Sequence, residues 1–503
     1  MKVPELFACL YVREFPVQAL LRLRPELRNQ PCVVMDDEPP LQQVCSLNDK
    51  AYSLGIACGM TRVEIDTFPS IVTLSRVRAE ESTAKAALLE CAGTFSPRIE
   101  DQSRDIAFVS VIDIAGTEKL FSTPAKLAEI LLRRVQDLGI QARIAISSNF
   151  HSSVCLARGM SSKTGVVVVS SEEQRAALAL LPVAVLDLSE DHAEIFSLWG
   201  IRTLGMLAAL PEKELISRIG QEGKRLRQLA RGELPHLFQP VEPPFTLEER
   251  MELDAPVELL DSLLFVIGVM LEQLVLRASA RVLALASVTI RLSLEGGASH
   301  VRTVRPALPT NDKQFWIKLL HLDLEAHPPQ AAILSLRLSA EPGNISKVQL
   351  GLFSPQLPEP MRLDVTLARI RAIVGDDCVG RVVLKDTHRP DDFRIEPFTI
   401  PSTQSSEIAP VQPRAAQRQL RPAESVTVSL RSKRPETFFF REKRYIVEHA
   451  YGPWLTSGDW WNQTLWGLEQ WDLVARSHDG AQLCCVLVRD LLDSRWEMAA
   501  LYD

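Results

Sequence analysis

The residues best suited to metal chemistry are carboxylates that lie near two strand-like segments in the first quarter of the chain. A two-metal phosphoryl transfer holds the attacking and leaving oxygens between two Mg²⁺ ions, and those ions need oxygen ligands. The strand-like segment 108–116 contains a single carboxylate, Asp113, with Asp105 just before it. Glu14 follows an earlier strand-like run, Leu6–Val12. Whether these side chains form a site depends on how the two strands are paired.

The segment Phe108-Val109-Ser110-Val111-Ile112-Asp113-Ile114-Ala115-Gly116 resembles the central palm hairpin of Y-family translesion DNA polymerases. Active members read S-x-D-E-x-x-x-D-x-T-G there, and the Asp-Glu pair helps to hold the catalytic metals. Matching 113–116 to D-x-T-G puts Phe108 and Val109 at that pair, and the first metal-binding Asp falls at Tyr11. The resemblance therefore implies lost catalytic positions at Tyr11, Phe108 and Val109, with no metal and no cofactor. A shifted pairing that gathers Glu14, Asp105 and Asp113 stays open; otherwise Asp113 is expected to hydrogen-bond the hairpin turn.

The triphosphate-binding motifs of the same family have also changed. Its Y-x-x-R motif corresponds to Asp49 and Tyr52, and the Lys of its I-G-I-A-x-N-K segment corresponds to Phe150. An Asp would repel a triphosphate, and neither Tyr nor Phe offers the bidentate donors of Arg. The resemblance thus implies three lost phosphate contacts.

Strands alternate with helices over the first part of the chain, which indicates an α/β layer. With the resemblance, the fold expected is α+β and multidomain: a right-hand Y-family polymerase-like core plus a small β-rich C-terminal module. The expected domains are palm and fingers at 1–165 (fingers about 18–75), a helical thumb with a degenerate helix-hairpin-helix at 166–240, a β-α-β-β-α-β little finger at 245–347, a clamp-binding peptide and extension at 348–400, a flexible linker at 401–432, and a Trp-rich module at 433–503.

Composition restricts the class of protein. The 503 residues include nine cysteines, and none of them forms a C-x-x-C pair, which argues against a zinc ribbon and favours a reducing compartment. No signal peptide is predicted, and no stretch is expected to approach the roughly 20 apolar residues of a membrane span. A cytoplasmic protein is the simplest interpretation. The formal charge of −7 makes tight, autonomous DNA binding less favourable.

Weak DNA contact is nevertheless predicted in two regions. Glycine turns in the thumb-like segment resemble relics of a helix-hairpin-helix, whose backbone N–H groups bind phosphate. The candidate residues there are Arg202, Gly220 and Gly223. In the little-finger-like segment, Arg291 and four further arginines are expected to form a stripe on one face: Arg277, Arg281, Arg302 and Arg305. Ordinary helix packing remains the alternative for the thumb residues.

A short peptide after the little-finger-like segment is the predicted recruitment site. Gln349-Leu350-Gly351-Leu352-Phe353 resembles the Q-L-x-L-F peptide that binds the bacterial sliding clamp, the DNA polymerase III beta subunit. Leu350, Leu352 and Phe353 would fill an apolar pocket, and the Gln349 amide would fix the register. The alternative is a last strand of the little finger over 348–353, which the central glycine and the prolines downstream disfavour.

Six of the eight tryptophans lie in the C-terminal 65 residues or so. The segments G-P-W, S-G-D-W-W, E-Q-W-D and the closing Y-D there resemble the ImuB family of catalytically degenerate Y-family polymerase-like proteins. That resemblance implies an error-prone C-family DNA polymerase and a RecA-like accessory protein as partners. The expected contact residues are Trp454, Trp460, Trp461, Trp466 and Trp471. The basic and aromatic segment 431–444 offers single-stranded DNA as another use.

The function expected is therefore that of a non-catalytic adaptor in damage-induced mutagenesis, the SOS response included, that links the sliding clamp to its polymerase. An active Y-family polymerase with displaced metal ligands and a damaged-DNA-binding module are the alternatives.

Overall fold

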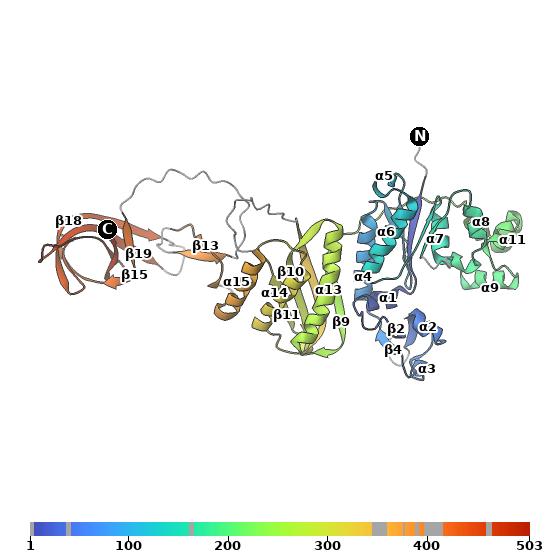
Figure 1. Cartoon of the computed structure of the whole chain (residues 1–503), viewed down its shortest axis with the longest axis horizontal. Coiled ribbons are helices and arrows are strands. Elements are labelled where there is room, and N and C mark those ends of the chain that lie inside the picture. Colours follow the sequence, from blue (N-terminus) through green and yellow to red (C-terminus); the bar gives the residue numbers. More distant parts are fainter. Residues whose placement is uncertain are drawn as a thin grey trace. The chain divides into compact units, whose positions relative to one another are not determined.

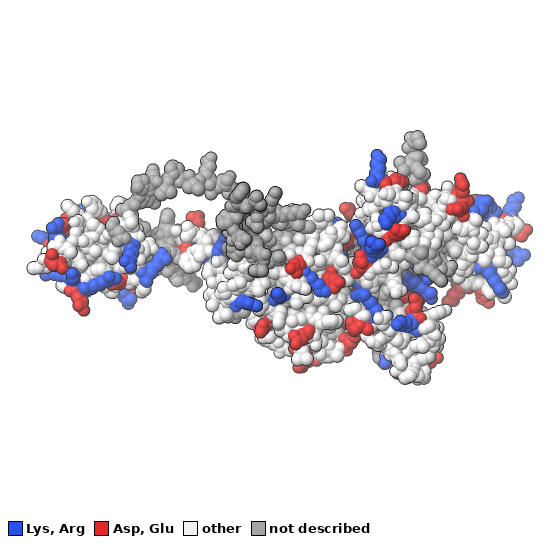
Figure 2. Space-filling view, viewed as in Figure 1, with Lys and Arg blue, Asp and Glu red and all other residues white. Residues whose placement is uncertain are grey.

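The computed structural model describes residues 5–36, 42–159, 165–344, 360–375, 378–387, 392–396, 416–458 and 465–502. The chain divides into two compact units, Met1–Ala372 and Ile373–Asp503 (Figure 1). The clamp-type peptide 349–353 lies outside the described residues, as do Trp460 and Trp461. On the face shown in Figure 2, Lys and Arg side chains are interspersed with Asp and Glu.

The palm-like part of the first unit is a five-stranded sheet covered on both faces. Its strand order is β5-β6-β1-β7-β8, and β1 is antiparallel to both β6 and β7. Because both faces are covered, the central strands are apolar at consecutive positions rather than at alternate ones. Helices α4 and α6 pack on one face and α7 on the other. The elements are β1 (Phe7–Val12), α4 (Arg78–Gly93), β5 (Ile99–Asp101), β6 (Phe108–Asp113), α5 (Glu118–Phe121), α6 (Pro124–Asp137), β7 (Arg143–Ser147), α7 (Phe150–Gly159) and β8 (Val166–Val168).

The fingers-like part is a small three-stranded sheet with order β3-β2-β4. A capping box between Thr61 and Glu64 starts one of its short helices, so that the side chain of each residue accepts a backbone N–H of the other. The elements are α1 (Phe15–Arg22), β2 (Cys32–Asp36), β3 (Gln43–Leu47), α2 (Asp49–Ser53), α3 (Arg62–Ile65) and β4 (Val72–Ser75).

A helical thumb-like part follows the palm, as the sequence predicts. Its core is continuous with the apolar side chains that cover the α7 face of the palm sheet. The elements are α8 (Gln174–Ala179), the 3-10 helix η1 (Val183–Leu186), α9 (Glu190–Leu198), α10 (Leu204–Ala209), α11 (Glu212–Ile219) and α12 (Gln221–Arg231).

The little-finger-like part has the predicted β-α-β-β-α-β order. Its elements are β9 (Leu247–Val257), α13 (Leu260–Ala280), β10 (Leu283–Leu294), the short 3-10 helix η2 (Glu295–Gly297), β11 (Ser299–Val304), α14 (Lys313–Ala326) and β12 (Ile333–Asn344). The strands form an antiparallel sheet with order β11-β10-β12-β9. Among the described helices, α13 alone is long and apolar enough to match a membrane span, so the expectation that no stretch approaches this length was wrong. Half of its apolar window is buried, and it supplies core residues to this domain.

A buried ionic network joins the little-finger-like part to α1 and α4. Glu249 of β9 is fully buried and pairs with Arg22 of α1 and Arg277 of α13. Arg277 also binds both oxygens of Glu90 on α4, at 2.8 Å. A second pair, Arg24 and Glu80, is separated by 2.8 Å and is also buried. We refer to these residues (Arg22, Arg24, Glu80, Glu90, Glu249 and Arg277) as the ionic seam.

The second unit contains a β-rich module that begins earlier than predicted. Its sheet has seven strands with order β15-β21-β20-β19-β18-β17-β16, and Figure 1 shows the sheet curled into a barrel. The flexible linker expected over 401–432 is wrong for its C-terminal half, because two strands occupy 417–431. The strands are β15 (Gln417–Ser425), β16 (Thr427–Arg431), β17 (Arg434–Phe440), β18 (Lys443–Gly458), β19 (Trp466–Ser477), β20 (Gln482–Asp490) and β21 (Trp496–Tyr502).

The extension between the little finger and the barrel is partly described. It contains α15 (Pro360–Val374) and a hairpin of β13 (Arg381–Leu384) and β14 (Phe393–Glu396).

Candidate functional site

The end of the palm sheet that contains Tyr11, Phe108 and Val109 carries mainly apolar side chains. In the β1–β6 pairing, Tyr11 lies opposite Val109 and Val12 opposite Phe108. Phe108 and Val109 are both fully buried. Phe108 packs into the α4 and α6 layer, with its ring 5.7 Å from that of Phe15, whereas Val109 packs into the α7 layer on the other face. Neither side chain offers an oxygen ligand.

The alternative carboxylate cluster does not form. Asp113 lies opposite Phe7, at the other end of β6 from Val109. As predicted, its carboxylate accepts a hydrogen bond from the Ala115 N–H at 3.1 Å, and it also pairs with Arg98 at 3.0 Å. Within the described residues, no group of three or more His, Cys, Asp or Glu side chains is placed to hold a metal ion.

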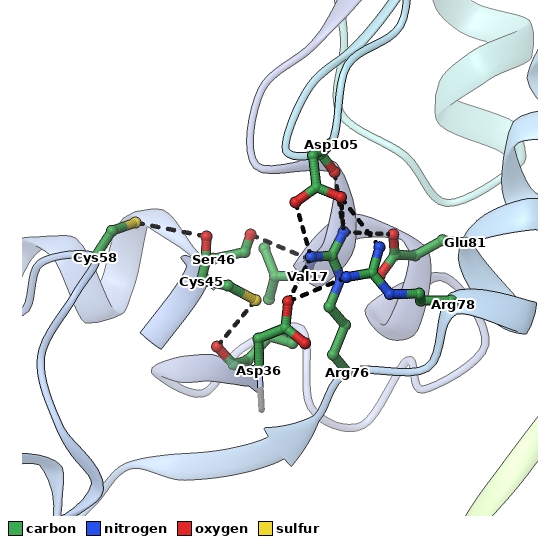
Figure 3. Close-up of polar contacts among 10 residues, drawn as sticks. Val17, Asp36, Cys45, Ser46, Cys58, Arg76, Arg78, Glu81 and Asp105 are labelled. Carbon is green, nitrogen blue, oxygen red and sulfur yellow. Dashed lines mark hydrogen bonds and ion pairs between the residues drawn. The ribbon is translucent and has the colours of Figure 1, made fainter. Parts of the chain in front are cut away.

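Asp105 is held by an arginine instead (Figure 3). The buried Arg76 guanidinium pairs with Asp105 at 2.9 Å, Asp36 at 2.7 Å and Glu81 at 2.7 Å. Arg78 adds a contact to Asp105 at 3.1 Å. The hydrogen bonds that Arg76 donates lower the pKa of Asp105, and the acceptance of these bonds by Glu81, Asp105 and Asp36 raises the pKa of Arg76. The guanidinium thus gathers three carboxylates from the fingers sheet, α4 and the β5–β6 hairpin.

A polar cavity of about 440 Å³ opens beside Tyr11. Its charged and polar lining includes Arg13, Glu14, Asp49 and Arg143. Burial raises the pKa of Tyr11 above its ordinary value.

The three residues assigned to lost triphosphate contacts are not gathered at this cavity. Asp49 lines it, whereas Tyr52 is 62% exposed and has the Arg13 guanidinium 5.7 Å from its ring. Phe150 lies at the Phe7 end of β1, 5.9 Å from the Phe7 ring and stacked on His236 at 3.6 Å. Asp49 and Tyr52 are therefore near the end of the sheet that carries Tyr11, whereas Phe150 is at the other end of β1.

The thumb residues proposed for DNA contact have mixed roles. Gly220 has φ +72° and separates α11 from α12, and Arg202 is exposed in the turn between α9 and α10. Gly223 is different, because a Cβ there would come within 2.7 Å of Ile219 Cγ1 and 3.0 Å of the Leu215 carbonyl oxygen. Close packing of two helices explains Gly223 without a phosphate.

The arginine stripe predicted on the little finger is wrong in one of its members and rearranged in others. Arg277 is buried in the ionic seam and cannot reach DNA. Arg302 binds Asp323 through two nitrogens, at 2.7 and 3.0 Å, and Arg305 pairs with Glu341 at 2.7 Å. Arg281 lies over the Phe245 ring, with its guanidinium 4.3 Å from the ring centroid. These four arginines do not form one surface row.

A different row of arginines crosses the open face of the little-finger sheet. Arg291 of β10 lies opposite Arg337 of β12, which lies opposite Arg250 of β9. Each one stands between two buried neighbours, so all three side chains point away from the helices. Arg337 approaches Glu248, and Arg250 approaches Glu252, each at 3.4 Å. We refer to Arg250, Arg291 and Arg337 as the arginine row. These residues are far apart in the sequence, and the strand register that brings them together could not be predicted from the sequence alone.

The tryptophans proposed as partner contacts differ in exposure. Trp454 is 56% exposed and Trp466 is half-buried. Trp471 is 1% exposed, lies in the barrel core and donates its indole N–H to Glu469 at 2.9 Å. Trp471 is therefore a core residue rather than a contact residue.

Known proteins are similar in sequence to residues 10–158 and, over a longer match, to most of the chain. Residues 10–158 match the impB/mucB/samB family. Protein ImuB of Caulobacter vibrioides is 26% identical over 414 residues, covering 78% of this chain and 85% of that protein.

The chain resembles ImuB. The ImuB match is much longer than the family segment, so the similarity continues beyond the palm and fingers. DNA polymerase IV of Dehalococcoides mccartyi is 28% identical over 216 residues, or 42% of this chain, and this chain spans about half of that polymerase (54%). The crystal structure of DinB from Sulfolobus solfataricus aligns with 68% of the chain, at 15% identity and a TM-score of 0.42. The ImuB similarity supports a Y-family polymerase-like protein with a role in mutagenesis.

Proposed function

We propose that this protein is a non-catalytic, polymerase-like adaptor of translesion synthesis that works in the cytoplasm and is made in response to DNA damage. The observation that carries the proposal is the pair of buried apolar residues, Phe108 and Val109, beside Tyr11 at the end of the palm sheet. Phosphoryl transfer needs oxygen ligands at the reacting phosphate, and this end of the sheet offers a phenol, a phenyl and an isopropyl group. The similarity to ImuB supports the same conclusion.

The adaptor would connect three protein partners and DNA. Residues 349–353 would bind the sliding clamp, and the barrel would bind an error-prone C-family polymerase and a RecA-like accessory protein. The arginine row would hold DNA weakly through its phosphates. Two binding segments on one chain raise the effective concentration of the polymerase at the clamp, so each contact need not be strong by itself.

The test measures clamp binding and primer extension on the same purified full-length chain. Replacing both apolar anchors, with Leu352→Ala and Phe353→Ala, should weaken clamp binding by about 30-fold or more, since two buried interface side chains are lost. Gln356→Ala, three residues beyond the peptide, is the matched control and should bind like the wild type. Neither the wild type nor the variants should extend a primer with Mg²⁺.

Other results would favour the alternatives. Mg²⁺-dependent extension by the wild type would identify an active polymerase with displaced ligands, and the proposed loss of the carboxylates would be wrong. Absence of clamp binding would favour the alternative that residues 348–353 are the last strand of the little finger. Primer-template affinity that survives deletion of the peptide and the barrel, without any protein partner, would indicate a damaged-DNA-binding module.

A further inference from the structure

The first hairpins of the C-terminal barrel concentrate positive charge on an otherwise acidic chain. Residues 431–444 contain six Lys or Arg and two Glu, whereas the whole chain has a formal charge of −7. These residues span the β16–β17 turn, the strand β17 and the β17–β18 turn. A local excess of cations favours a polyanionic ligand.

Three of these cations are available for a ligand. Arg431 pairs with Glu436, Arg441 with Glu424, and Lys443 with Asp479. Lys433, Arg434 and Arg444 are exposed, and none of them forms an ion pair with any residue that the structure describes. They can therefore approach phosphates without first breaking an existing pair.

An aromatic ring is exposed on the outer face of β17 next to Arg444, whereas Lys433 and Arg434 lie at the opposite end of that strand. The alternation of β17 sends Phe438 and Phe440 into the barrel core, at 0% and 6% exposure, and turns Phe439 outward at 50% exposure. Strand register places Phe439 between Thr427 of β16 and Arg444 of β18. An outward phenyl ring flanked by a hydroxyl and a guanidinium suits a base stacked on the ring with its phosphate on the cation.

The surface continues along β18. Ile446 is 56% exposed and lies between Thr437 of β17 and Arg476 of β19. Farther along the strand, Tyr451 is 58% exposed. Phe439, Ile446 and Tyr451 thus lie along β17 and β18, with Arg444 beside Phe439. Arg476 is paired with Glu448 at 2.7 Å and is not an additional available cation. The core of a protein-binding patch is depleted of charge, whereas here a guanidinium without an ion pair among the described residues lies next to the exposed ring.

We propose that the outer face of β16, β17 and β18 binds single-stranded DNA, with Phe439 as the stacking ring and Lys433, Arg434 and Arg444 as phosphate contacts. The choice of DNA over another single strand rests on the proposed function in translesion synthesis; the surface itself does not depend on the clamp peptide. Stacking is sequence-tolerant, because every base presents a π face. The site would hold exposed template beside the lesion while the barrel's other surfaces remain open to protein partners.

The experiment titrates full-length chain against a 5′-fluorescein-labelled 20-mer of oligothymidine and follows fluorescence anisotropy at several salt concentrations. The arginine row is first neutralised (Arg250→Ser, Arg291→Ser and Arg337→Ser), so that the barrel dominates the signal. In that background, Phe439→Ala should weaken binding by about 5- to 150-fold, the range for loss of one base–aromatic stack. Phe439→Trp should restore binding, whereas Phe439→Leu should not.

Charge contacts and location are tested separately. Arg444→Ala should reduce the slope of log K against log salt by about 0.7, the value for one phosphate contact on a single strand. Arg495→Ala, a 76% exposed residue on another loop of the barrel, is the matched control and should leave the slope unchanged. Phe439 is half exposed, so its variants should keep the wild-type circular dichroism spectrum.

Several results would overturn the proposal. Equal affinity of wild type and Phe439→Ala, or full rescue by Phe439→Leu, would rule out stacking. Tighter binding of oligouridine than of oligothymidine would assign the surface to RNA, and loss of a protein partner with unchanged oligothymidine binding would assign it to that partner. Clamp binding, measured on the same variants, should be unaffected and separates this result from failure of the adaptor proposal.

Discussion

Glu249 binds two arginines that come from distant parts of the chain. It lies on β9 with 0% exposure, between Arg22 of α1 and Arg277 of α13. A buried ion pair contributes little net stability compared with apolar residues of the same size, but removal of one partner leaves a buried charge without compensation. In this arrangement, loss of Glu249 would weaken both of its arginine contacts at once.

We expect Glu249→Ala to lower the free energy of unfolding by about 3–5 kcal/mol. The adjacent Glu248 is the matched control, because its side chain is 38% exposed and contacts Arg337 at 3.4 Å. Glu248→Ala should cost about 1 kcal/mol or less. Urea unfolding of both variants gives the comparison, and equal costs would mean that the seam adds nothing beyond an ordinary surface pair.

His151 lies on α7 beside a second histidine and a carboxylate. Its ring centroid is 5.0 Å from that of His236, whose Nε2 is 2.9 Å from Glu100 Oε1. Burial, followed by the charges of His236 and Arg225, lowers the pKa of His151 to about 4; Glu100 acts in the opposite direction. The unfolded chain therefore binds a proton at His151 near pH 6.5, while the folded chain does so only near pH 4.

We expect this difference to make the fold less stable as pH falls from about 6.5 to about 4, because the unfolded state takes up the proton first. The contribution should be about 1–2 kcal/mol after allowance for solvent screening. His151→Gln should remove this part of the pH dependence and behave like the wild type above pH 7. The free energy of unfolding of both proteins is measured with urea at each pH. An equal loss of stability in the two proteins on acidification would assign the effect to other groups.

At the scale of single elements, strand β6 contributes side chains to the hydrophobic cores on both faces of the palm sheet. Phe108 fills one face of the sheet and Val109 the other. We expect Phe108→Asp to lose about 4 kcal/mol or more of unfolding free energy, from the cavity and the buried carboxylate together. Phe108→Leu, which stays apolar, should cost about 1 kcal/mol. A small loss in the Asp variant, measured by thermal unfolding with and without Mg²⁺, would mean that this position can accommodate a ligand.

The little-finger sheet presents three arginines from three strands on its open face. Replacing all three (Arg250→Ser, Arg291→Ser and Arg337→Ser) should lower the affinity for a primer-template duplex and reduce the slope of log K against log salt by up to about 0.9 for each residue. Arg305→Ser in the same domain is the control, because Arg305 lies outside the row and pairs with Glu341 at 2.7 Å, more closely than Arg250 and Arg337 pair with their glutamates. An effect of Arg305→Ser equal to that of the row would mean that general charge, and not this face, attracts DNA.

The elements differ in how far the sequence predicts them. The β-α-β-β-α-β order of the little finger is confirmed, and it was implied by the family resemblance rather than derived from apolar periodicity. Sequence reasoning places Arg277 wrongly on the surface, because spacing along a helix cannot show that two buried glutamates lie on neighbouring elements. Strand β15 is missed because it is a polar strand at the edge of the sheet, with a proline inside it, and such strands lack the apolar alternation of a half-buried one.

The same limit applies to the candidate sites. The apolar character of positions 11, 108 and 109 can be read from residue types, and the strand register brings these positions together. Tertiary contacts between segments far apart in sequence produce both the ion pair of Asp105 with Arg76 and the arginine row. Of the tryptophans, Trp471 shows that an aromatic residue near a chain end is as readily a core residue as a contact.

For the whole molecule, the division at Ala372 has a direct consequence for stability. Contacts within Met1–Ala372 and within Ile373–Asp503 define two compact units. We expect a chain that ends after Ala372 to have the same free energy of unfolding, within about 1 kcal/mol, as the first unit has in the full chain, because the core of that unit is complete. Tryptophan fluorescence separates the transitions, because six of the eight tryptophans are in the second unit. A large destabilisation on truncation would show that the two units fold cooperatively.

The opposed packing of Phe108 and Val109 also bears on the evolution of such a chain. A carboxylate introduced at either position by a single substitution would enter a dry core, and among the residues that the structure describes no group of His, Cys, Asp or Glu side chains is placed to bind a metal ion with it. Each such substitution therefore lowers the stability of the fold without assembling a metal site. We expect selection for a stable fold to keep hydrocarbon side chains at both positions of this strand.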